Sequence, residues 1–286
     1  METQTLLYSF AGGSDGASPS GSLIFDASGN LYGTTFEGGS GSDGTVFELA
    51  PSSSGWTETV LHTFTGGADG RGPGGNLLLD STGRIYGAAL LGGTVNSSCS
   101  EGCGTIFRLA NSSGTWRFTR LFDFQGTTGG SAPTAIVFDA AGNIYGTAYA
   151  GGAVCSGSGC GVVFKLSPST SGGPWKEKIL HAFTKQADGS GPYGIAFDFK
   201  RNLYGTTFGG ASQNEGAVWE LSPTTTGPWK FTQVYAFGKG TSGYEPDAGV
   251  IVDSKGNLYG TCSGGSTAET EWGTLFEFSP TSSATK

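Results

Sequence analysis

The sequence is poor in charged residues, in histidine and in long apolar runs, and each shortage excludes a class of function. Only 13% of the 286 residues are charged, and 15 Lys and Arg stand against 23 Asp and Glu, so the net charge is −8. Nucleic-acid-binding surfaces need clustered basic residues, which excludes a phosphate-backbone partner. No run of about 20 apolar residues is present, so no membrane-spanning helix is expected. The two histidines are too few for a metal centre built from several of them.

Glycine and aromatic residues are abundant instead. The chain has 53 glycines and 12% aromatic residues, whereas glycine averages about 7% of residues in proteins. No segment shows a sustained helical period of about 3.6 residues, and glycine and threonine are too frequent for helices. Short aromatic-rich runs separated by glycine-rich turns favour many short strands. We therefore predict an all-β fold.

The five cysteines form two close pairs and one remainder. Cys99 and Cys103 lie in CSEGC, and Cys155 and Cys160 lie in CSGSGC, so each pair can close a small loop. A zinc site is the alternative, but its cysteines usually stand two residues apart and are joined by other ligands. Two local disulfides are therefore expected, which implies an oxidising compartment. Cys262 is left over.

One eight-residue motif recurs five times along the chain. It reads GNLYGTTF at 29–36, and near-copies occupy 83–90, 142–149, 201–208 and 256–263. A second motif, LYSF at 7–10, returns in varied form at 61–64, 121–124, 180–183 and 234–237. Both recur every 54 to 60 residues, and a fixed period of this kind indicates a repeat architecture. Five units fill residues 1–286, so we predict a single domain without a linker.

Each unit has the pattern of four short antiparallel strands. In the fourth unit the strands are expected at 194–198, 202–208, 216–222 and 229–237. Repeated four-stranded units are typical of β-propeller blades. We predict a five-bladed β-propeller whose four-stranded antiparallel blades span approximately 21–64, 75–124, 134–183, 193–237, and 248–280 together with 3–10.

The two ends of the chain carry complementary parts of one unit. The chain begins with a fourth strand at 3–10 and ends after a third strand at 273–280. Pairing of residues 3–10 with residues 273–279 would close the ring and cover two sheet edges that would otherwise be exposed. A linear solenoid is the alternative, and it gives no reason to split a unit in this way.

Residues that recur in every unit are expected to serve the scaffold. The glycine of the YGT motif is expected to allow close approach between blades, and Trp56 and its equivalents to pack between blades. Asp26 and its equivalents are expected to accept backbone hydrogen bonds in the first turn. His62 and His181 share a position that other units fill with Tyr or Phe. They are therefore expected to be packing residues and not catalytic ones.

The repeat resembles a known family. The segment FAGGSDGASPSGSLIFDASGNLYGTTFEGGSGSDGTVFELAP at 10–51, with FTGGADGRGP at 64–73 and NLYGTTFGG at 202–210, is similar to the GloVer tandem repeat of bacterial extracellular proteins. The half-unit GIAFDFKRNLYGTT at 194–207 also resembles the first two strands of an NHL-type propeller blade. The resemblance implies a secreted or surface-displayed protein. It implies no activity, because the family has no agreed catalytic motif.

The long loops carry the first group of candidate residues. Loops between second and third strands, and between units, share one face of a propeller, where functional residues are expected. Asp15, Asp69 and Asp188 occupy equivalent positions there, in SDGASP, ADGRGP and ADGSGP. One interpretation is a structural turn, since Asp-Gly is a turn sequence. The other is a ring of small sites that each bind one sugar or one cation and gain avidity together.

The fifth unit departs most from the repeat and carries the second group. The candidate catalytic residues are Glu245, Asp247, Glu269 and Glu271, and the candidate ligand-binding residues are Tyr193, Tyr244 and Trp272 together with Asp15, Asp69 and Asp188. Paired carboxylates suit glycoside chemistry, in which one acid protonates the leaving oxygen and a second carboxylate acts as base or nucleophile. The same oxygens suit Ca²⁺. A solvated acidic rim is the remaining interpretation.

These observations lead to three hypotheses about function. The first is a secreted or cell-surface propeller that binds carbohydrate or glycan through its long-loop face. The second is a glycoside-active enzyme, a hydrolase or lyase, that uses the carboxylates of the fifth unit. The third is a structural surface repeat for protein–protein interaction. The expected partner is a polysaccharide or glycan, with no nucleic acid and no membrane span. We expect a monomer with no metal centre and no cofactor, Ca²⁺ being the one alternative.

Overall fold

The computed structural model describes residues 4–152, 155, 157, 159–169, 173–238, 243–265 and 272–280. Within these residues all regular secondary structure is β, in nineteen strands, and no helix is present. The prediction of an all-β fold is therefore confirmed. No helix that could cross a membrane is found in the described part of the chain.

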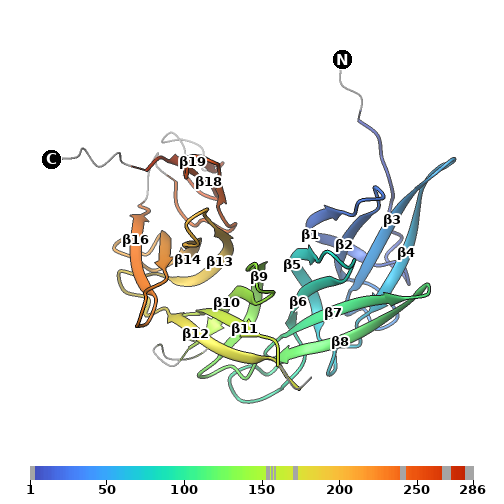
Figure 1. The fold of residues 1–286 in the computed structure, drawn as a ribbon, viewed down its shortest axis with the longest axis horizontal. Coiled ribbons are helices and arrows are strands. Elements are labelled where there is room, and N and C mark those ends of the chain that lie inside the picture. The colour runs from blue at the N-terminus through green and yellow to red at the C-terminus, as the bar shows by residue number, and fades with distance from the viewer. Residues whose placement is uncertain are drawn as a thin grey trace. The chain divides into compact units, whose positions relative to one another are not determined.

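The strands follow one another as antiparallel meanders (Figure 1). Meander 1 consists of β1 Ala17–Phe25, β2 Leu31–Glu37, β3 Thr45–Ser52 and β4 Gly55–Thr63. Meander 2 consists of β5 Arg71–Leu79, β6 Ile85–Leu91, β7 Thr105–Ser112 and β8 Thr115–Asp123. Meander 3 consists of β9 Gly130–Phe138, β10 Ile144–Gly151, β11 Val162–Ser167 and β12 Lys176–Ala182. Meander 4 consists of β13 Ser190–Phe197, β14 Leu203–Gly209, β15 Ala217–Ser222 and β16 Lys230–Ala236. Meander 5 has three strands in its described part, β17 Ile251–Val252, β18 Leu258–Cys262 and β19 Thr274–Phe278.

The chain falls into two compact units. Unit 1 comprises Met1–Gln125, Ser131–Ile136 and Pro168–Lys176, and unit 2 comprises Gly126–Gly130, Val137–Ser167 and Glu177–Lys286. Unit 1 thus holds meanders 1 and 2, and unit 2 holds meanders 4 and 5 with most of meander 3. The single propeller domain, its five blade boundaries and its ring closure stay predictions.

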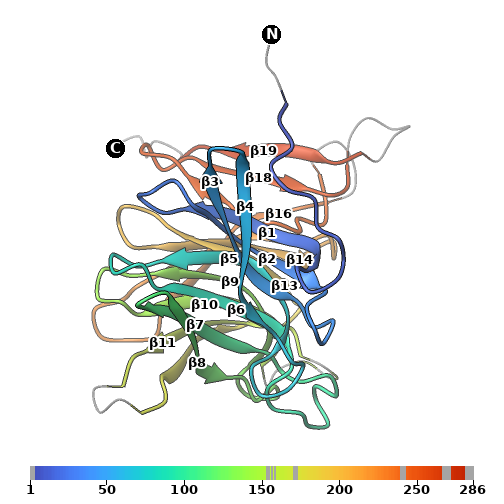
Figure 2. The same ribbon diagram turned by 90° about the vertical axis from the view of Figure 1, so that its right-hand side faces the viewer.

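In unit 1 the first strands of the two meanders join them into one sheet. β1 and β5 are parallel at the pair Ser22 and Asn76, so β1 lies between β2 and β5 (Figure 2). Asn76 continues this chain of contacts toward β9. Its side-chain amide donates to the carbonyl of Ile136 at 2.8 Å and accepts from the Ile136 N–H at 3.1 Å. The meanders of unit 1 therefore contact one another through their first strands.

A second contact between meanders uses a residue in the left-handed region just before a proline. The N–H of this residue donates to the carbonyl of a residue in the preceding meander, and the acceptor is followed by a glycine. We call these contacts seam bonds. The seam bonds are Gly72 to Asp43 at 2.8 Å, Ala132 to Cys103 at 3.0 Å, Gly191 to Cys160 at 2.9 Å and Glu245 to Glu215 at 2.9 Å.

The glycine beside each seam bond leaves space for the proline of the next meander. A Cβ built on Gly44, Gly104, Gly161 or Gly216 would lie between 2.3 and 2.7 Å from a proline Cδ. All four glycines have φ between 89° and 95°, a region that costs other residues free energy. The glycines of the long loops are therefore required by the packing of one meander on the next.

The glycine of the YGT motif has a different role from the one expected. A Cβ on Gly33 would lie 2.5 Å from the Phe47 ring, and one on Gly205 would lie 2.3 Å from the Trp219 ring. Both rings come from the third strand of the same meander. The expectation of close approach between blades is therefore corrected, because the glycine makes room for an aromatic ring of its own sheet.

The expectation for the first turn is confirmed. The Asp26 carboxylate accepts hydrogen bonds from the N–H groups of Ser28 and Asn30, from the Asn30 side chain and from the Tyr32 hydroxyl, at 2.8 to 3.1 Å. Equivalent bonds hold the turns at Asp80, Asp139, Asp198 and Asp253. These aspartates are structural.

Two of the repeated tryptophans pack as predicted. Trp116 of β8 packs on Tyr32 of β2, with ring centroids 6.2 Å apart, and Trp229 packs on Tyr145 of β10 at 5.9 Å. Each pair joins neighbouring meanders within one unit. The tryptophans therefore belong to the hydrophobic core between meanders.

Residues 4–10 form no strand. Tyr8 and Phe10 instead pack beside the buried cluster of Leu31, Phe47 and Leu49 in unit 1. Phe10 contacts the Phe47 ring edge-on, with centroids 5.0 Å apart. Tyr8 and Phe10 are thus packed inside unit 1 while Leu6 and Leu7 are exposed, and the pairing of the segment with residues 273–279 stays a prediction.

Candidate functional site

Three aspartates of the long loops hold the loop together. Asp69 contacts the His62 ring at 3.2 Å and accepts from the Thr65 hydroxyl at 2.6 Å. Asp188 contacts the His181 ring at 3.1 Å and accepts from the Thr184 N–H at 3.0 Å. Asp15 likewise accepts from the Tyr8 hydroxyl at 3.0 Å and the Ala11 N–H at 2.8 Å. Their oxygens are engaged, which favours the turn interpretation over one sugar or cation per unit.

The partner of each aspartate is a ring seven residues earlier, at a position we call the ring slot. The ring slot holds Tyr8, His62, Phe122, His181 and Tyr235. Asp follows seven residues after Tyr8, His62 and His181, whereas Gly129 follows Phe122 and Ser242 follows Tyr235. Phenylalanine has no polar atom to offer a carboxylate. Each aspartate at this position therefore follows a ring with a polar atom, but such a ring does not require an aspartate.

The histidines of the ring slot are packed as expected. His62 stacks on Phe118 and His181 stacks on Phe231, in both cases with centroids 4.3 Å apart. Burial lowers the pKa of His62, and the opposing charge of Asp69 offsets part of this effect. Burial raises the pKa of Asp188, but the hydrogen bonds from His181 and Thr184 outweigh it and leave a lowered pKa. These groups stabilise the loop and leave no free base.

Both predicted disulfides are present and lie in the long loops. Cys99 is joined to Cys103 and Cys155 to Cys160, with Cα atoms 5.2 and 5.6 Å apart. Cys103 and Cys160 are also the acceptors of seam bonds. Each disulfide therefore fixes the carbonyl that receives the next meander.

The candidate residues of the fifth repeat lie in different environments. Glu245 has φ of 53°, and its carbonyl accepts from the N–H and the hydroxyl of Ser263 at 3.1 and 2.9 Å. The Tyr244 ring lies against Gly264, with which it also exchanges two backbone hydrogen bonds. Trp272 is 84% exposed. Glu269 and Glu271 lie outside the described residues.

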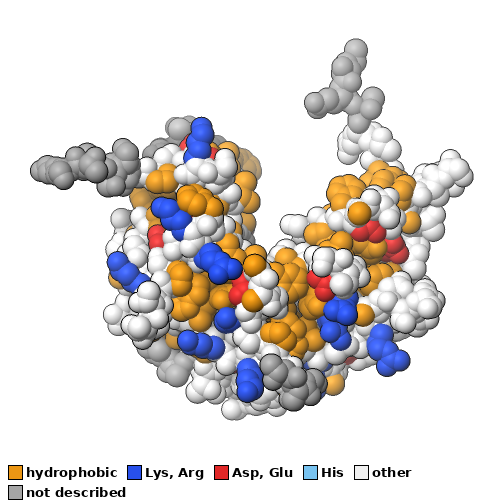
Figure 3. All heavy atoms as spheres, viewed as in Figure 1, with side chains coloured by type: hydrophobic (Ala, Val, Ile, Leu, Met, Phe, Trp, Pro, Cys, Tyr) orange, Lys and Arg blue, Asp and Glu red, His pale blue; other side chains and the backbone are white. Residues whose placement is uncertain are grey.

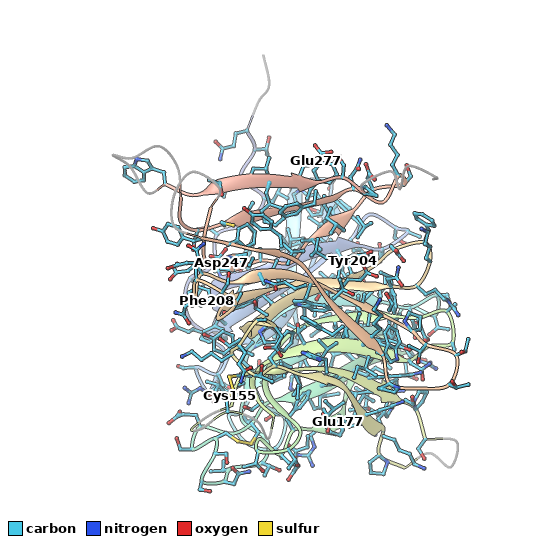
Figure 4. All side chains as sticks on the ribbon, turned by 90° about the vertical axis from the view of Figure 1, so that its left-hand side faces the viewer. Cys155, Glu177, Tyr204, Phe208, Asp247 and Glu277 are labelled. Atoms are coloured by element: carbon cyan, nitrogen blue, oxygen red, sulfur yellow. A yellow bond between two sulfur atoms is a disulfide. The ribbon has the colours of Figure 1, made fainter. Side chains whose placement is uncertain are left out.

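Asp247 and Tyr193 come together with two aromatic residues that the sequence did not single out. Tyr193 lies between Tyr149 and Phe208, with ring centroids 5.4 and 6.5 Å away. Asp247 is exposed and close enough for its charge to act on Tyr193. Figure 4 shows Asp247 and Phe208 at the same end of the strands as Cys155, where the long loops lie. We call these four residues the aromatic patch.

The electrostatics of the aromatic patch centre on Tyr193. Burial is the main cause that raises the pKa of Tyr193, and the neighbouring Tyr149 and Asp247 raise it further. The hydroxyl therefore stays protonated and can donate a hydrogen bond. Tyr149 is 38% exposed and its ring covers Gly191, whose Cβ would lie 2.6 Å from it. An exposed carboxylate and a partly exposed tyrosine thus lie beside the half-buried Tyr193.

The sequence contained a signal for one of these two residues, Tyr149. Tyr149 ends the motif copy at 142–149, where the other four copies end in Phe36, Leu90, Phe208 and Ser263. Tyr149 is the only member with a phenol hydroxyl. Phe36 covers Gly72 as Tyr149 covers Gly191, so the ring serves the scaffold and the hydroxyl is the addition. A comparison of the five copies position by position would have found it.

Cys262, the cysteine left over from the two pairs, is a buried small residue. It is 4% exposed, and it stands where Thr35 and Thr207 stand in other meanders. Burial raises the pKa of its thiol to about 11, Thr274 lowers it by a hydrogen bond and Asp247 raises it by charge. The thiol is therefore protonated and unreactive at neutral pH.

Charged side chains are dispersed over the described surface. Lys and Arg lie singly on the face in Figure 3 and form no cluster there. Among the described residues no three His, Cys, Asp or Glu side chains are close enough together to hold a metal ion. The aromatic patch remains the place where candidate residues converge.

A model of the Gloeobacter/Verrucomicrobia repeat matches residues 1–176 and 156–286, which together span the chain. The chain belongs to the Gloeobacter/Verrucomicrobia repeat family. The resemblance noted in the repeats is thereby confirmed. No curated protein matches this member of the family.

Solved structures of similar fold include proteins described as gluconolactonases. One, described as a candidate gluconolactonase, has a TM-score of 0.54 at 13% identity and covers 90% of this chain and 77% of its own. A gluconolactonase from Xanthomonas campestris has a TM-score of 0.53 at 16% identity, and the match covers 92% of this chain and 77% of that one. A candidate 6-phosphogluconolactonase from Bacteroides uniformis has a TM-score of 0.53 at 17% identity, and the match covers 91% of this chain and 68% of that one. This likeness places the repeat family member among gluconolactonase-like β-propeller folds.

Proposed function

We propose that the chain is a secreted or cell-surface five-bladed β-propeller that binds carbohydrate through the aromatic patch. The observation that carries this proposal is the pairing of Tyr149 and Tyr193 at 5.4 Å beside the exposed Asp247. Repeat-derived aspartates do not serve as the ligand groups, because Asp15, Asp69 and Asp188 are engaged in their own loops.

The chemistry of the aromatic patch suits a sugar. A sugar ring has an apolar face of C–H groups and a rim of hydroxyls. Tyrosine rings offer an apolar face with a polar tip, and an ionised carboxylate accepts strong hydrogen bonds from hydroxyls. The rings would cover the sugar face, while Asp247 and the phenol hydroxyls would bond to its rim.

Extracellular placement rests on two observations. The described chain contains two disulfides, which persist in oxidising compartments. The family also resembles a repeat of bacterial extracellular proteins. Structures of similar fold include proteins described as gluconolactonases, so this fold already serves sugar-derived ligands elsewhere.

The test is a glycan array followed by titration of the retained glycan. Tyr193→Ala and Tyr149→Phe are expected to weaken binding, the first by about tenfold because it removes a ring and a hydroxyl. Phe36→Ala is the matched control, since it removes from meander 1 the ring that stands where Tyr149 stands in meander 3. If no glycan is retained by the unmodified protein, or if Phe36→Ala weakens binding as much as Tyr193→Ala, the proposal fails.

A carbohydrate-active enzyme is the second candidate, favoured by the exposed carboxylate of Asp247 beside Tyr193. The glycans used in the array can be incubated with the protein and examined for released products. Asp247→Asn, Glu245→Gln and Glu271→Gln are expected to abolish release if the fifth unit supplies the acid and the base. Equal release by all three variants would remove these residues from any mechanism.

A further inference from the structure

A pocket of about 370 Å³ lies in unit 2 at the end of the strands opposite to the long loops. It is formed where the first turns of meanders 3 and 4 meet the turn between β15 and β16. Its lining includes Asp139, Tyr145, Phe197, Asp198, Arg201 and Trp229. The aromatic patch is at the other end of the same strands, so this pocket is a separate site.

Arg201 breaks the repeat at this pocket. The first turn of the other four units has glycine at the equivalent position, namely Gly29, Gly83, Gly142 and Gly256, with φ between 77° and 87°. Arg201 has φ of 70° and keeps the same turn, donating its N–H to the Asp198 carbonyl at 3.1 Å. A side chain in this region costs free energy that glycine avoids. The turn itself therefore does not require the arginine.

The guanidinium of Arg201 is available to a ligand. Arg201 is exposed and takes part in none of the ion pairs formed by the described residues. In contrast, Arg84 in the first turn of meander 2 reaches its own Asp80 at 3.8 Å. Arginine has five donors in a planar fork that matches a carboxylate. An oxygen-bearing anion is thus the group that would complete this site.

The two carboxylates of the pocket do not compete for the guanidinium. Asp198 accepts from the N–H groups of Lys200 and Asn202 at 2.8 Å and from the Asn202 side chain at 2.9 Å. Asp139 is held in the same way by its own turn. Burial raises the pKa of Asp139, but these hydrogen bonds and the charge of Lys165 outweigh it and lower the pKa. Both carboxylates are therefore committed to structure.

The remaining walls of the pocket are aromatic. The Tyr145 ring lies 5.2 Å from Phe197 and 5.9 Å from Trp229, and Phe197 and Trp229 are half-buried. Such walls suit a ring with an apolar face more than an extended peptide or a phosphate alone. The equivalent crevice of unit 1 has the Tyr32 and Trp116 pair but Gly83 in place of the arginine. Among the described residues, aromatic walls beside a guanidinium without an ion pair are thus particular to the pocket of unit 2, because Arg84 at the crevice of unit 1 is paired with Asp80.

We propose that this pocket binds a carboxylate-bearing sugar, a uronic-acid residue of an acidic polysaccharide. Arg201 would pair with the carboxylate in bidentate fashion, and the sugar ring would lie on Phe197 and Trp229. Lys200 would add positive charge at the rim, where it lies 5.5 Å over the Phe199 ring. The proposal goes beyond the aromatic patch, because it assigns a second site with a charged ligand to the other end of the strands.

The test is titration calorimetry with oligomers of galacturonate, mannuronate and guluronate, and with neutral galactose and mannose oligomers of the same length. At least one uronate oligomer is expected to bind the unmodified protein. Arg201→Gly restores the residue of the other four units, so the variant is expected to fold normally and to bind that oligomer about tenfold more weakly or worse. The uronate affinity of Arg201→Lys is expected to lie between those of the unmodified protein and Arg201→Gly, since lysine keeps the charge but lacks the planar fork of donors.

Two controls make the outcome specific. Lys255→Ala removes a positive charge from the first turn of meander 5 and is expected to leave uronate binding unchanged. Tyr193→Ala is expected to weaken neutral-glycan binding at the aromatic patch and to leave uronate binding unchanged, so the two proposals can fail separately. The pocket proposal is overturned if no uronate oligomer binds, if neutral oligomers bind it equally well, or if Arg201→Gly binds uronate as the unmodified protein does.

Discussion

Replacing Glu177 by Gln is expected to stabilise the protein at alkaline pH and to change little at pH 4. Glu177 lies half-buried in β12, and its Oε1 has no hydrogen-bond partner among the described residues. Burial raises the pKa of this carboxyl from 4.5 to about 7. Because the folded-state pKa is raised, the fold prefers the protonated acid. The stability penalty is therefore absent below pH 4.5, grows as the pH rises to about 7, and then levels off.

The size of the effect follows from the two pKa values. The interval between 4.5 and about 7 corresponds to about 3.4 kcal/mol at roughly 1.36 kcal/mol per pH unit. The side chain is only half-buried, and water screens part of the penalty, so we expect about 2 kcal/mol. Glutamine fills the same space without a charge, so its packing should be unchanged.

The assay is urea unfolding of both proteins at intervals from pH 4 to pH 9. Other ionisable groups are the same in both proteins, so their contributions cancel in the difference. Glu58→Gln is the matched variant, because Glu58 stands at the equivalent position of β4 and burial and the charge of Asp15 raise its pKa too. Its effect should have the same sign and a smaller size. Parallel stability curves for Glu177→Gln and the unmodified protein would refute the reasoning.

Three further predictions concern the scaffold. Replacing Cys99 and Cys103 by Ser should lower the free energy of unfolding by about 2 kcal/mol, because the disulfide closes a short loop; an unchanged urea midpoint would contradict this. Asp188→Asn should cost about 1 to 2 kcal/mol at pH 7, and the difference should vanish as the pH falls through the lowered pKa of Asp188, where both proteins are uncharged at this site. Gly216→Ala should cost more than about 2 kcal/mol, because its Cβ would lie 2.2 Å from a carbonyl oxygen. Gly29→Ala meets no atom within 4 Å and should cost about 1 kcal/mol, so equal thermal shifts would speak against the packing argument.

The elements that sequence could predict are those whose cause is local or periodic. The turn at Asp26 is predictable because the donors and the acceptor stand within six residues of each other. The packing role of His62 is predictable because a position that accepts Phe cannot depend on a titrating group. Both disulfides were predictable for the same reason, since each joins cysteines four or five residues apart.

The candidate site was less accessible to the same reasoning. Tyr149 and Tyr193 come from different meanders of unit 2, and their proximity follows from the seam between meanders 3 and 4, which no local pattern reveals. The fork of Arg201 was visible in the sequence as KRN in place of the usual Gly-Asn. Arg201 lies in a short first turn, whereas functional residues were expected on the long loops. Glu269 and Glu271 stay candidates on sequence alone.

The dependence of the loop aspartates on the ring slot gives a rule for reading other members of this family. An aspartate seven residues after a Tyr or His in the ring slot is expected to form a hydrogen bond with that ring residue. An aspartate at the same place after Phe would lack this partner and keep only the donors of its own loop, so its carboxylate would be more open to sugars or cations. Among repeats of nearly identical sequence, the residue in the ring slot would thus distinguish structural aspartates from those that are open to ligands, without a structure of each protein.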